Sequence, residues 1–437
     1  MEILVKVVQF FICFTLLVGL HEFGHFITAR IFKMRVDKFY IFFDPWFSIF
    51  KIKRGETEYG LGWLPLGGYC KIAGMIDESM DKEQMAKPAQ PDEFRAKPAW
   101  QRFIVMVAGV VMNILLAITI YIGVCYAWGE SYLPTERVEW GYDFNETGHQ
   151  LGFENGDKVI SIDGEKIEDV ALIVNRLLLS DGDRTVVVER NGSEATLTIP
   201  LEDLIEMRKA KAHVDLLTLR MPFIVDSVES EGAQVLQSGD QIVAINGEDM
   251  ESYAECRAAI ISHKGEEITL SALRGVDTIT LSVPVSDEGL IGVLTRKPFV
   301  MESRSYTLLE SIPAGFRRAG SAVSSYMGQL SLIFQPKTEM YRELGGFVAI
   351  GNMFSSVWNW QDFWLKTAFL SIMLAVMNIL PIPGLDGGHA IFTLFEMVTG
   401  RKPSDKFLET AQYIGMLFLF ALLIYANGND FYRLIFG

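Results

Sequence analysis

The sequence predicts a polytopic α-helical membrane protein with four transmembrane helices, a membrane-associated β-sheet and two α/β modules outside the cytoplasm. Three observations support this fold class. Half of the 437 residues are hydrophobic, four apolar segments are long enough to cross a bilayer, and a ten-residue motif recurs in the polar middle of the chain. The chain therefore divides into membrane-embedded ends and a polar centre.

Four apolar segments are expected to span the membrane, because about 20 consecutive apolar residues cover the hydrocarbon core. They run over residues 3–32, 103–128, 363–380 and 407–426. The first segment has no small-residue cleavage site after a short apolar core, so we expect a retained helix rather than a signal peptide. Four crossings place both termini on one side of the membrane.

Basic residues are concentrated beside the loop that joins the first two spans and the loop that joins the last two. Lys and Arg are enriched in cytoplasmic loops of membrane proteins. These two loops are therefore predicted to be cytoplasmic, and both termini and the polar middle region are predicted to be extracytoplasmic.

Charge and cysteine content argue against several classes of function. The formal net charge is −15, which disfavours nucleic acid as a partner because nucleic-acid binding needs basic surfaces. The four cysteines, Cys13, Cys70, Cys125 and Cys256, form no CxxC pair, so the sequence indicates neither a disulfide framework nor a thiolate zinc site. A metal would need other ligands.

Residues 38–72, between the first two spans, alternate apolar and polar side chains around a turn at residues 54–56. Such alternation is typical of strands. We expect a small β-sheet that lies against the membrane on its cytoplasmic side.

The polar middle region contains an internal repeat, because GDKVISIDGE (Gly156–Glu165) recurs as GDQIVAINGE (Gly239–Glu248). Each copy predicts a strand, a tight turn, a helix and a further strand pair, and the pair resembles the PDZ domains of bacterial proteases. After the repeat, apolar residues from Leu309 to Leu330 recur with helical spacing and predict an amphipathic helix.

These elements give a predicted order of parts along the chain. The parts are residues 1–34 with the first span, 35–100 with the cytoplasmic-side β region, 101–128 with the second span, 129–213 and 214–300 with the two PDZ-like domains, 301–360 with the extracytoplasmic amphipathic helix and its loop, 361–400 with the third span, and 401–437 with the fourth.

The motif HEFGH (residues 21–25) lies inside the first span. His21 and His25 are four residues apart, so on a helix their imidazoles share one face and can bind one metal ion, with Glu22 beside them. A charged side chain in the bilayer costs roughly 2.5–3.5 kcal/mol on insertion scales. Three ionisable residues so close together therefore indicate a metal site rather than a polar contact between helices.

Asp386 is the candidate third ligand, because a catalytic zinc needs three protein ligands and one open position. It stands in NILPIPGLDGGH (Asn378–His389), where Pro381 and Pro383 are expected to break the third helix. A helix cap or turn residue is the alternative role for Asp386, and His389 is a weaker candidate ligand.

HEFGH in the first span, NILPIPGLDGG in the third and the repeated modules between the second and third spans together resemble the site-2 protease family, which consists of M50-type intramembrane zinc metalloproteases. Within the family, the bacterial regulator-of-sigma-E protease type with two PDZ domains is the most similar. The resemblance covers nearly the whole chain, including PLGGYCKIAG (Pro65–Gly74) and the VAGVVMN stretch that ends at Asn113.

The resemblance implies specific roles for site residues. It implies Zn²⁺ held by His21, His25 and Asp386, with Glu22 as the general base. It further implies that Asn378 holds the substrate backbone near the metal and that Asn113 assists, although both asparagines could instead make polar contacts between helices.

The resemblance also implies an endopeptidase of the bacterial cytoplasmic (inner) membrane. Its expected substrates are single-span membrane proteins, such as anti-sigma factors already cut once outside the cytoplasm, or remnant signal peptides. The β region is expected to pair with the unwound substrate as an added strand, although a sheet without substrate contact is the alternative. The PDZ-like domains are expected to exclude bulky substrates, with capture of a peptide C-terminus as the alternative.

Two further classes of function compete with this hypothesis. A membrane scaffold that binds peptides through its modules would need no general base, so the intact Glu22 argues against it. A metal transporter would need a series of polar sites across the spans, which the sequence lacks.

Overall fold

The computed structural model describes residues 2–64, 67–75, 88–210, 212–230, 233–296 and 299–436. The chain forms two compact units: Met1–Glu130 with Ser305–Gly437, and Ser131–Arg304. Residues 65 and 66, which open the PLGGYCKIAG motif, and residues 76–87 of the predicted β region lie outside the described residues.

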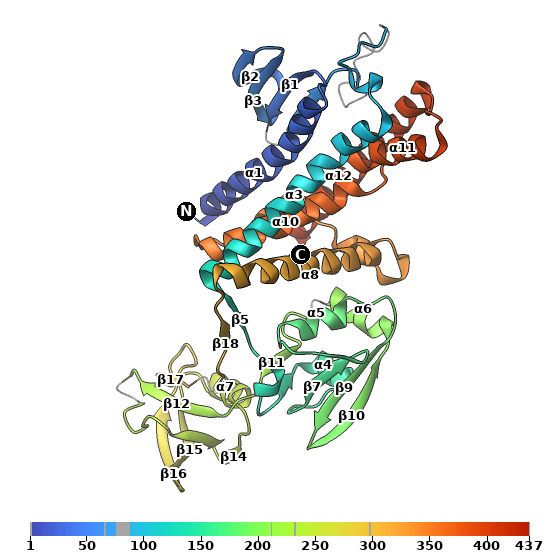
Figure 1. Cartoon of the computed structure of the whole chain (residues 1–437). Helices are drawn as coiled ribbons and strands as arrows, with labels where there is room; N and C mark the ends of the chain where they lie inside the picture. The colour runs from blue at the N-terminus through green and yellow to red at the C-terminus, as the bar shows by residue number, and fades with distance from the viewer. Residues whose placement is uncertain are drawn as a thin grey trace. The chain divides into compact units, whose positions relative to one another are not determined.

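The first unit is mainly helical (Figure 1). Its helices are α1 (Glu2–Ile31), α3 (Ala99–Trp128), α8 (Leu308–Ile333), α9 (Phe347–Asn352), α10 (Trp360–Ile379), α11 (Asp386–Thr399) and α12 (Asp405–Phe436). Within the described residues, α1, α3, α10 and α12 are long and apolar enough to cross a membrane. The prediction of four apolar spans is therefore confirmed.

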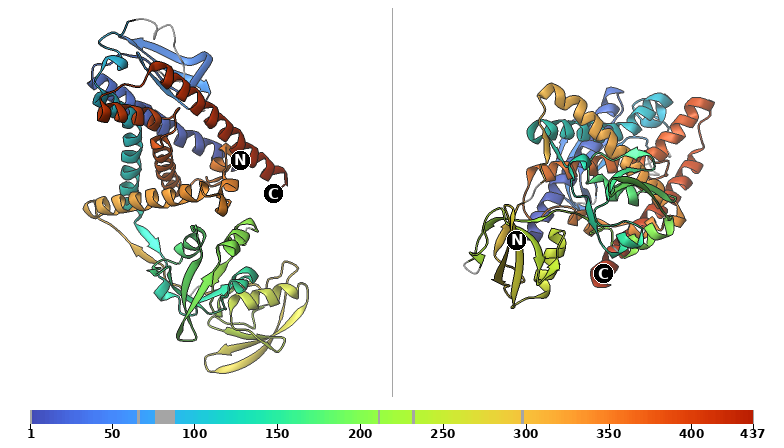
Figure 2. Two further views of the ribbon diagram at one scale, coloured as in Figure 1. Left: turned by 90° about the vertical axis from the view of Figure 1, so that its right-hand side faces the viewer. Right: turned by 90° about the horizontal axis from the view of Figure 1, so that it is seen from below.

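Helix α3 is central to the packing of this unit. It lies beside α1 and α10, and α8 crosses it in the views of Figures 1 and 2. Ala117 and Tyr121 of α3 share a buried cluster with Tyr326 of α8 and Ile372 of α10. Helix α8 therefore buries one face against the spans, as its predicted amphipathic pattern requires.

The predicted break after the third span is confirmed. Helix α10 ends at Ile379, and α11 begins at Asp386 after the two prolines, which cannot donate a backbone hydrogen bond. A Cβ added at Gly387 would lie 2.2 Å from the carbonyl oxygen of Leu380. A glycine at this position is therefore needed for the chain to fold back closely after α10.

The fourth span is longer than its apolar segment predicts, because α12 continues beyond Ala426 to Phe436. A polar contact with α9 stabilises this extension. The Asp430 carboxylate accepts hydrogen bonds from the backbone N–H groups of Gly346 (2.9 Å), Val348 (3.0 Å) and Ala349 (3.0 Å). Asp430 thus satisfies the free N–H groups at the start of α9.

The predicted small sheet is also present in the first unit. Its strands are β1 (Val36–Ile41), β2 (Phe43–Arg54), β3 (Thr57–Leu64) and β4 (Tyr69–Ile72), in the order β2-β3-β1-β4. Phe26 of α1 packs against the rings of Phe39 and Tyr59, with ring centroids 5.3 and 5.8 Å away. The sheet therefore rests on the helix that carries HEFGH, and β4 forms one edge.

The second unit contains the internal repeat, and both copies form the same strand arrangement. Strand β7 pairs with β8 and β9, and β9 pairs with β10; in the second copy β13 pairs with β14 and β15, and β15 pairs with β16. A short helix follows the first strand pair in each copy, α5 in one and α7 in the other. The predicted duplication of one module is thus present in three dimensions.

The elements of the middle region have the following bounds. The strands are β5 (Glu130–Tyr132), β6 (Tyr142–Phe144), β7 (Lys158–Ile162), β8 (Glu165–Lys166), β9 (Arg184–Arg190), β10 (Ser193–Ile199), β11 (Leu217–Leu219), β12 (Phe223–Val228), β13 (Gln241–Ile245), β14 (Glu248–Asp249), β15 (Glu267–Arg274), β16 (Asp277–Pro284), β17 (Val293–Thr295) and β18 (Glu302–Arg304). The helices are α4 (Glu146–Gln150), α5 (Leu172–Leu178), α6 (Leu201–Lys209) and α7 (Tyr253–Ser262).

The aspartate of each GD turn is buried and fully engaged within its module. The Asp157 carboxylate accepts two hydrogen bonds from Arg190 (2.8 and 2.7 Å), and the Asp240 carboxylate accepts two from Arg274 at the same distances. One oxygen of each carboxylate also accepts a backbone N–H of its own turn. The repeated GD motif therefore closes a turn and anchors an arginine.

Candidate metal centre

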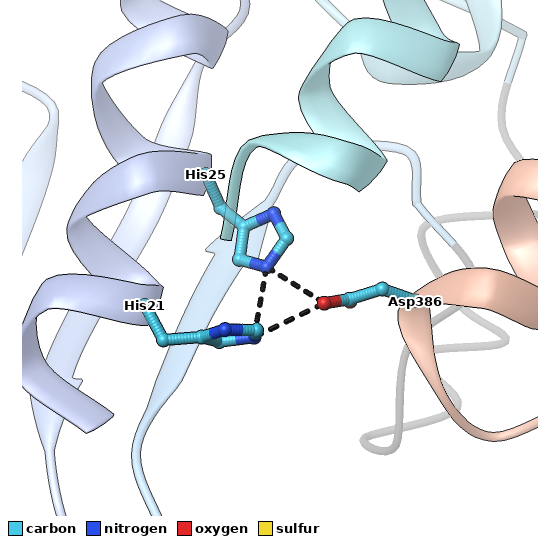
Figure 3. Close-up of side chains that lie close together, drawn as sticks. All are labelled: His21, His25 and Asp386. Atoms are coloured by element: carbon cyan, nitrogen blue, oxygen red, sulfur yellow. Dashed lines mark hydrogen bonds and ion pairs between the residues drawn. The ribbon is translucent and has the colours of Figure 1, made fainter. Parts of the chain in front are cut away.

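The side chains of His21, His25 and Asp386 converge on one point (Figure 3). Helix α1 supplies both histidines from adjacent turns, and Asp386 is the first residue of α11. Oδ2 of Asp386 lies 3.0 Å from Nε2 of His21 and 3.2 Å from Nε2 of His25, and the two nitrogens are 3.3 Å apart. The structure thus brings together the three ligands predicted from separate parts of the sequence.

This triangle fits a tetrahedral metal ion. Ligand atoms about 2.0–2.1 Å from a tetrahedral zinc are about 3.3–3.4 Å from one another, close to the observed separations. His25 donates Nδ1–H to the carbonyl oxygen of Val105 at 2.8 Å, which leaves the Nε2 lone pair facing the centre. Oδ2 of Asp386 is buried, and no described residue donates a hydrogen bond to it, so its two short contacts with imidazole nitrogens suit a shared cation.

Two asparagines lie against His21. Asn113 of α3 is fully buried, and Nδ2 of its amide is 3.3 Å from Nδ1 of His21. Its Oδ1 has no partner among the residues that the structure describes, and exchanging the two ends of the amide puts an acceptor against Nδ1–H. Nδ2 of Asn378 on α10 is 3.4 Å from Nε2 of His21. Asn113 is therefore positioned to orient His21, and its predicted contact with substrate stays a prediction.

Close packing against the histidines depends on a glycine that the sequence reasoning did not single out. A Cβ added at Gly109 of α3 would lie 2.5 Å from Nε2 of His25 and 2.6 Å from Cε1 of His21. Only glycine lets the α3 backbone approach this closely. The signal in the sequence was the Ala108-Gly109 pair within an otherwise apolar span.

A cavity of about 430 Å³ opens beside the three ligands. Glu22 lines it, next to the backbone of Cys70 in β4. His389 and Gln412 line the same cavity, and the sequence reasoning had not considered Gln412. The predicted general base, the predicted ligands and the edge strand of the sheet therefore meet around one space.

Cys70 also lines this cavity but is a poor ligand candidate. Among the His, Cys, Asp and Glu side chains of the described residues, the ligand atoms that converge are those of His21, His25 and Asp386, and Cys70 is not part of this group. The donor set of two imidazoles and one carboxylate is thus favoured, and it is a set that catalytic zinc sites use.

A buried ion pair fixes α11 against α3. Nη2 of Arg102 is 2.5 Å from Oε1 of Glu396, and Arg102 also donates from Nε to the carbonyl oxygen of Lys97 at 3.1 Å. Arg102 is 6% exposed and the Glu396 side chain is half-buried, so the pair is partly shielded from bulk water. The ion pair holds α11, which carries Asp386, against α3, which contacts both histidines.

Comparison with known proteins assigns this arrangement to a family. The family described as "Peptidase family M50" matches residues 9–422, nearly the whole chain. The chain belongs to peptidase family M50. The predicted resemblance to site-2 proteases is thereby confirmed.

Similar proteins come from several bacteria, and those described next are named "Putative zinc metalloprotease". The chain is 28% identical to one from Vibrio cholerae over 463 aligned residues, covering 99% of this chain and 100% of the relative. It is 24% identical to one from Thermotoga maritima, covering 98% and 99%. It is 28% identical to one from Xylella fastidiosa, covering 96% and 97%.

Membership of the M50 family confirms two predictions from the sequence. The protein is a metalloprotease, and its cofactor is zinc. The four apolar helices agree with a membrane location. The roles of individual residues stay predictions, which the geometry above supports.

Proposed function

We propose that this M50 peptidase hydrolyses peptide bonds within the transmembrane segments of single-span membrane proteins. One observation carries the proposal: the histidines of the metal centre lie on α1, a helix apolar enough to cross a membrane, and they face inward to a cavity. Ionisable residues in such a helix are costly unless they serve a site. Peptide bonds at membrane depth are the substrates that such a site can reach.

The chain supplies three ligands and a base for this reaction. A zinc ion bound by His21, His25 and Asp386 supplies Lewis acidity toward the scissile carbonyl. Glu22 takes a proton from the attacking water and returns it to the leaving amine nitrogen. Asn378, half-buried beside His21, holds the substrate backbone.

The proposed substrate must be extended at the point of cleavage, because an α-helix encloses its carbonyl groups in its own hydrogen bonds. Strand β4 supports this proposal. It is an edge strand, and its residues Tyr69–Ile72 line the cavity. A substrate segment that pairs with β4 as an added strand brings its backbone next to Glu22.

We further propose that the two repeat modules are PDZ-like domains that lie outside the cytoplasm, as do both termini, in a bacterial inner membrane. They exclude substrates with bulky outer domains. The engagement of Asp157 and Asp240 with arginines supports exclusion over peptide capture. Such a protease cuts after a first extracytoplasmic cleavage, on anti-sigma-factor-like proteins, or on remnant signal peptides.

The proposed function is tested with purified protein in detergent and a synthetic single-span transmembrane peptide. We expect the wild type to cleave the peptide and Glu22→Gln to abolish cleavage while zinc content stays unchanged. Glu22→Gln keeps the size of the side chain but removes the base. Cleavage that survives the substitution at full zinc content contradicts the proposed role of Glu22.

A further inference from the structure

Helix α12 brings one buried polar side chain to the cavity beside the metal centre. Among the side chains of α12 that the structure describes, Gln412, Gly415 and Asp430 are buried, and the others are half-buried or exposed. Asp430 contacts α9. The burial of Gln412, which is 4% exposed, therefore needs a separate explanation.

The docking of α12 explains why Gln412 reaches this cavity. A Cβ added at Gly415 would lie 1.5 Å from the carbonyl oxygen of Pro383. The α12 backbone thus touches the segment that leads directly into Asp386. Positions 412 and 415 are three residues apart and share one helix face, so the contact at Gly415 turns Gln412 toward the space lined by Asp386 and Glu22.

The amide of Gln412 has no hydrogen-bond partner within the part of the chain that the structure describes. Placing an amide at a buried position of an apolar helix costs free energy that a leucine would not cost. The amide atoms of Gln412 are not among the fully enclosed polar atoms that lack a partner. The amide lines the cavity instead. Its missing partner is therefore expected to be a group that enters this cavity.

The chemistry of the cavity identifies that group. An extended peptide presents N–H and C=O groups on both edges, and pairing with β4 satisfies one edge only. A carboxamide both donates and accepts hydrogen bonds, so it matches a peptide unit, whereas a carboxylate or an ammonium side chain matches only half of one. We propose that Gln412 hydrogen-bonds the backbone of the substrate peptide on the edge that β4 leaves free. This inference rests on the proposed function.

Binding and cleavage are measured separately to test the inference. The probe is a fluorescent single-span transmembrane peptide, and its Kd is measured with zinc-loaded protein that carries Glu22→Gln and cannot cut. Adding Gln412→Leu is expected to raise Kd about three- to tenfold, the loss of one hydrogen bond. In the active protein the same change is expected to raise KM by a similar factor with little change in kcat. Gln412→Asn, which keeps the amide, is expected to recover part of the loss.

A matched control separates this role from structural support. Gln9 is also buried in an apolar span, but its Nε2 donates to the carbonyl oxygen of Ser355 at 2.8 Å. Gln9→Leu is expected to lower stability and to leave Kd unchanged. Equal Kd values with and without Gln412→Leu, alongside normal cleavage by the wild type, overturn this inference alone. A zinc-loaded wild type that neither binds nor cleaves the peptide overturns the proposed function and this inference together.

Discussion

Aspartates with a buried carboxylate oxygen occur in both units of the protein, and their surroundings differ in kind. Asp157 and Asp240 in the repeat modules each meet an arginine and a backbone N–H, so their charge is balanced by the chain itself. Asp386 lies against two imidazole nitrogens, and the Nε2 lone pair of His25 points at the same centre. Within the described part of the chain, Oδ2 of Asp386 accepts no hydrogen bond. The first arrangement is complete without a ligand, whereas the second suits a shared cation.

This difference distinguishes the two motifs that stand out in the sequence. The repeated GD motif serves folding, because everything its carboxylate binds is within its own module. HEFGH and LDGG are predicted to serve chemistry, because the side chains of His21, His25 and Asp386 come from α1 and α11 and converge on one point. A buried carboxylate therefore indicates a metal site only when the chain leaves it without a counter-charge.

The largest expected effect comes from making the same substitution in both units. Asp386→Asn removes the anionic ligand, so we expect loss of nearly all bound zinc and of peptide cleavage. Asp240→Asn is expected to retain full zinc content. The zinc content of both purified variants is measured. Equal zinc content in the two would contradict the proposed difference between Asp386 and Asp240.

A smaller effect is expected at Asn113. Groups that orient a metal-ligating histidine typically contribute 10–100-fold to metal affinity, so Asn113→Leu is expected to weaken zinc binding by about that factor. The measurement is competition with a soluble chelator. Ser371→Ala is the control, because Ser371 donates to the backbone oxygen of Asn113 at 2.7 Å without touching the histidines. Unchanged zinc affinity in Asn113→Leu would mean that this amide does not orient His21.

Asp240→Asn should instead lower the stability of the second unit. The carboxylate is 1% exposed and accepts two hydrogen bonds from Arg274. A hydrogen bond to a charged group contributes roughly 1.5–3 kcal/mol, and asparagine keeps one acceptor oxygen. We therefore expect the free energy of unfolding to fall by on the order of 2 kcal/mol. Hydrogen exchange of the backbone amides in β13 and β15 measures this loss of stability. Undiminished protection there would show that the GD turn is not a stabilising element.

The pH dependence of the same unit is the mildest expected effect. The Arg274 guanidinium beside Asp240 holds the pKa of that carboxyl below its ordinary value. The stabilisation is therefore fully present above the ordinary pKa of about 4 and is lost as pH falls through the lowered value. Urea unfolding of the wild type should show falling stability below about pH 4, and Asp240→Asn should show a flatter profile. The same pH dependence of the free energy of unfolding in both proteins would contradict the contribution of Asp240 to acid sensitivity.

The sequence predicts most of the fold because its signals are local. Apolar length predicts the four spans, the prolines at 381 and 383 predict the break before α11, and the repeated GD motif predicts two matching modules. The extension of α12 to Phe436 could not be predicted in this way. It depends on Asp430 meeting α9, a contact between segments far apart in the chain.

The candidate site is likewise predictable where its signals are local. The spacing of His21 and His25 fixes them on one helix face, and the need for a third ligand points to Asp386. The fit of Gly109 against the imidazoles, the contact of Asn113 with His21 and the burial of Gln412 depend instead on how α3 and α12 pack. Helix packing of this kind leaves at most a weak signal in a single sequence, such as the Ala108-Gly109 pair.

X-ray absorption spectroscopy at the zinc edge of the purified, zinc-loaded protein tests the central claim most directly. The claim is that His21, His25 and Asp386 hold the metal, while Cys70 in the same cavity does not. The account predicts nitrogen and oxygen ligands at about 2.0–2.2 Å, including the scattering pattern of imidazole, and no sulfur. A zinc–sulfur distance of about 2.3 Å would contradict it.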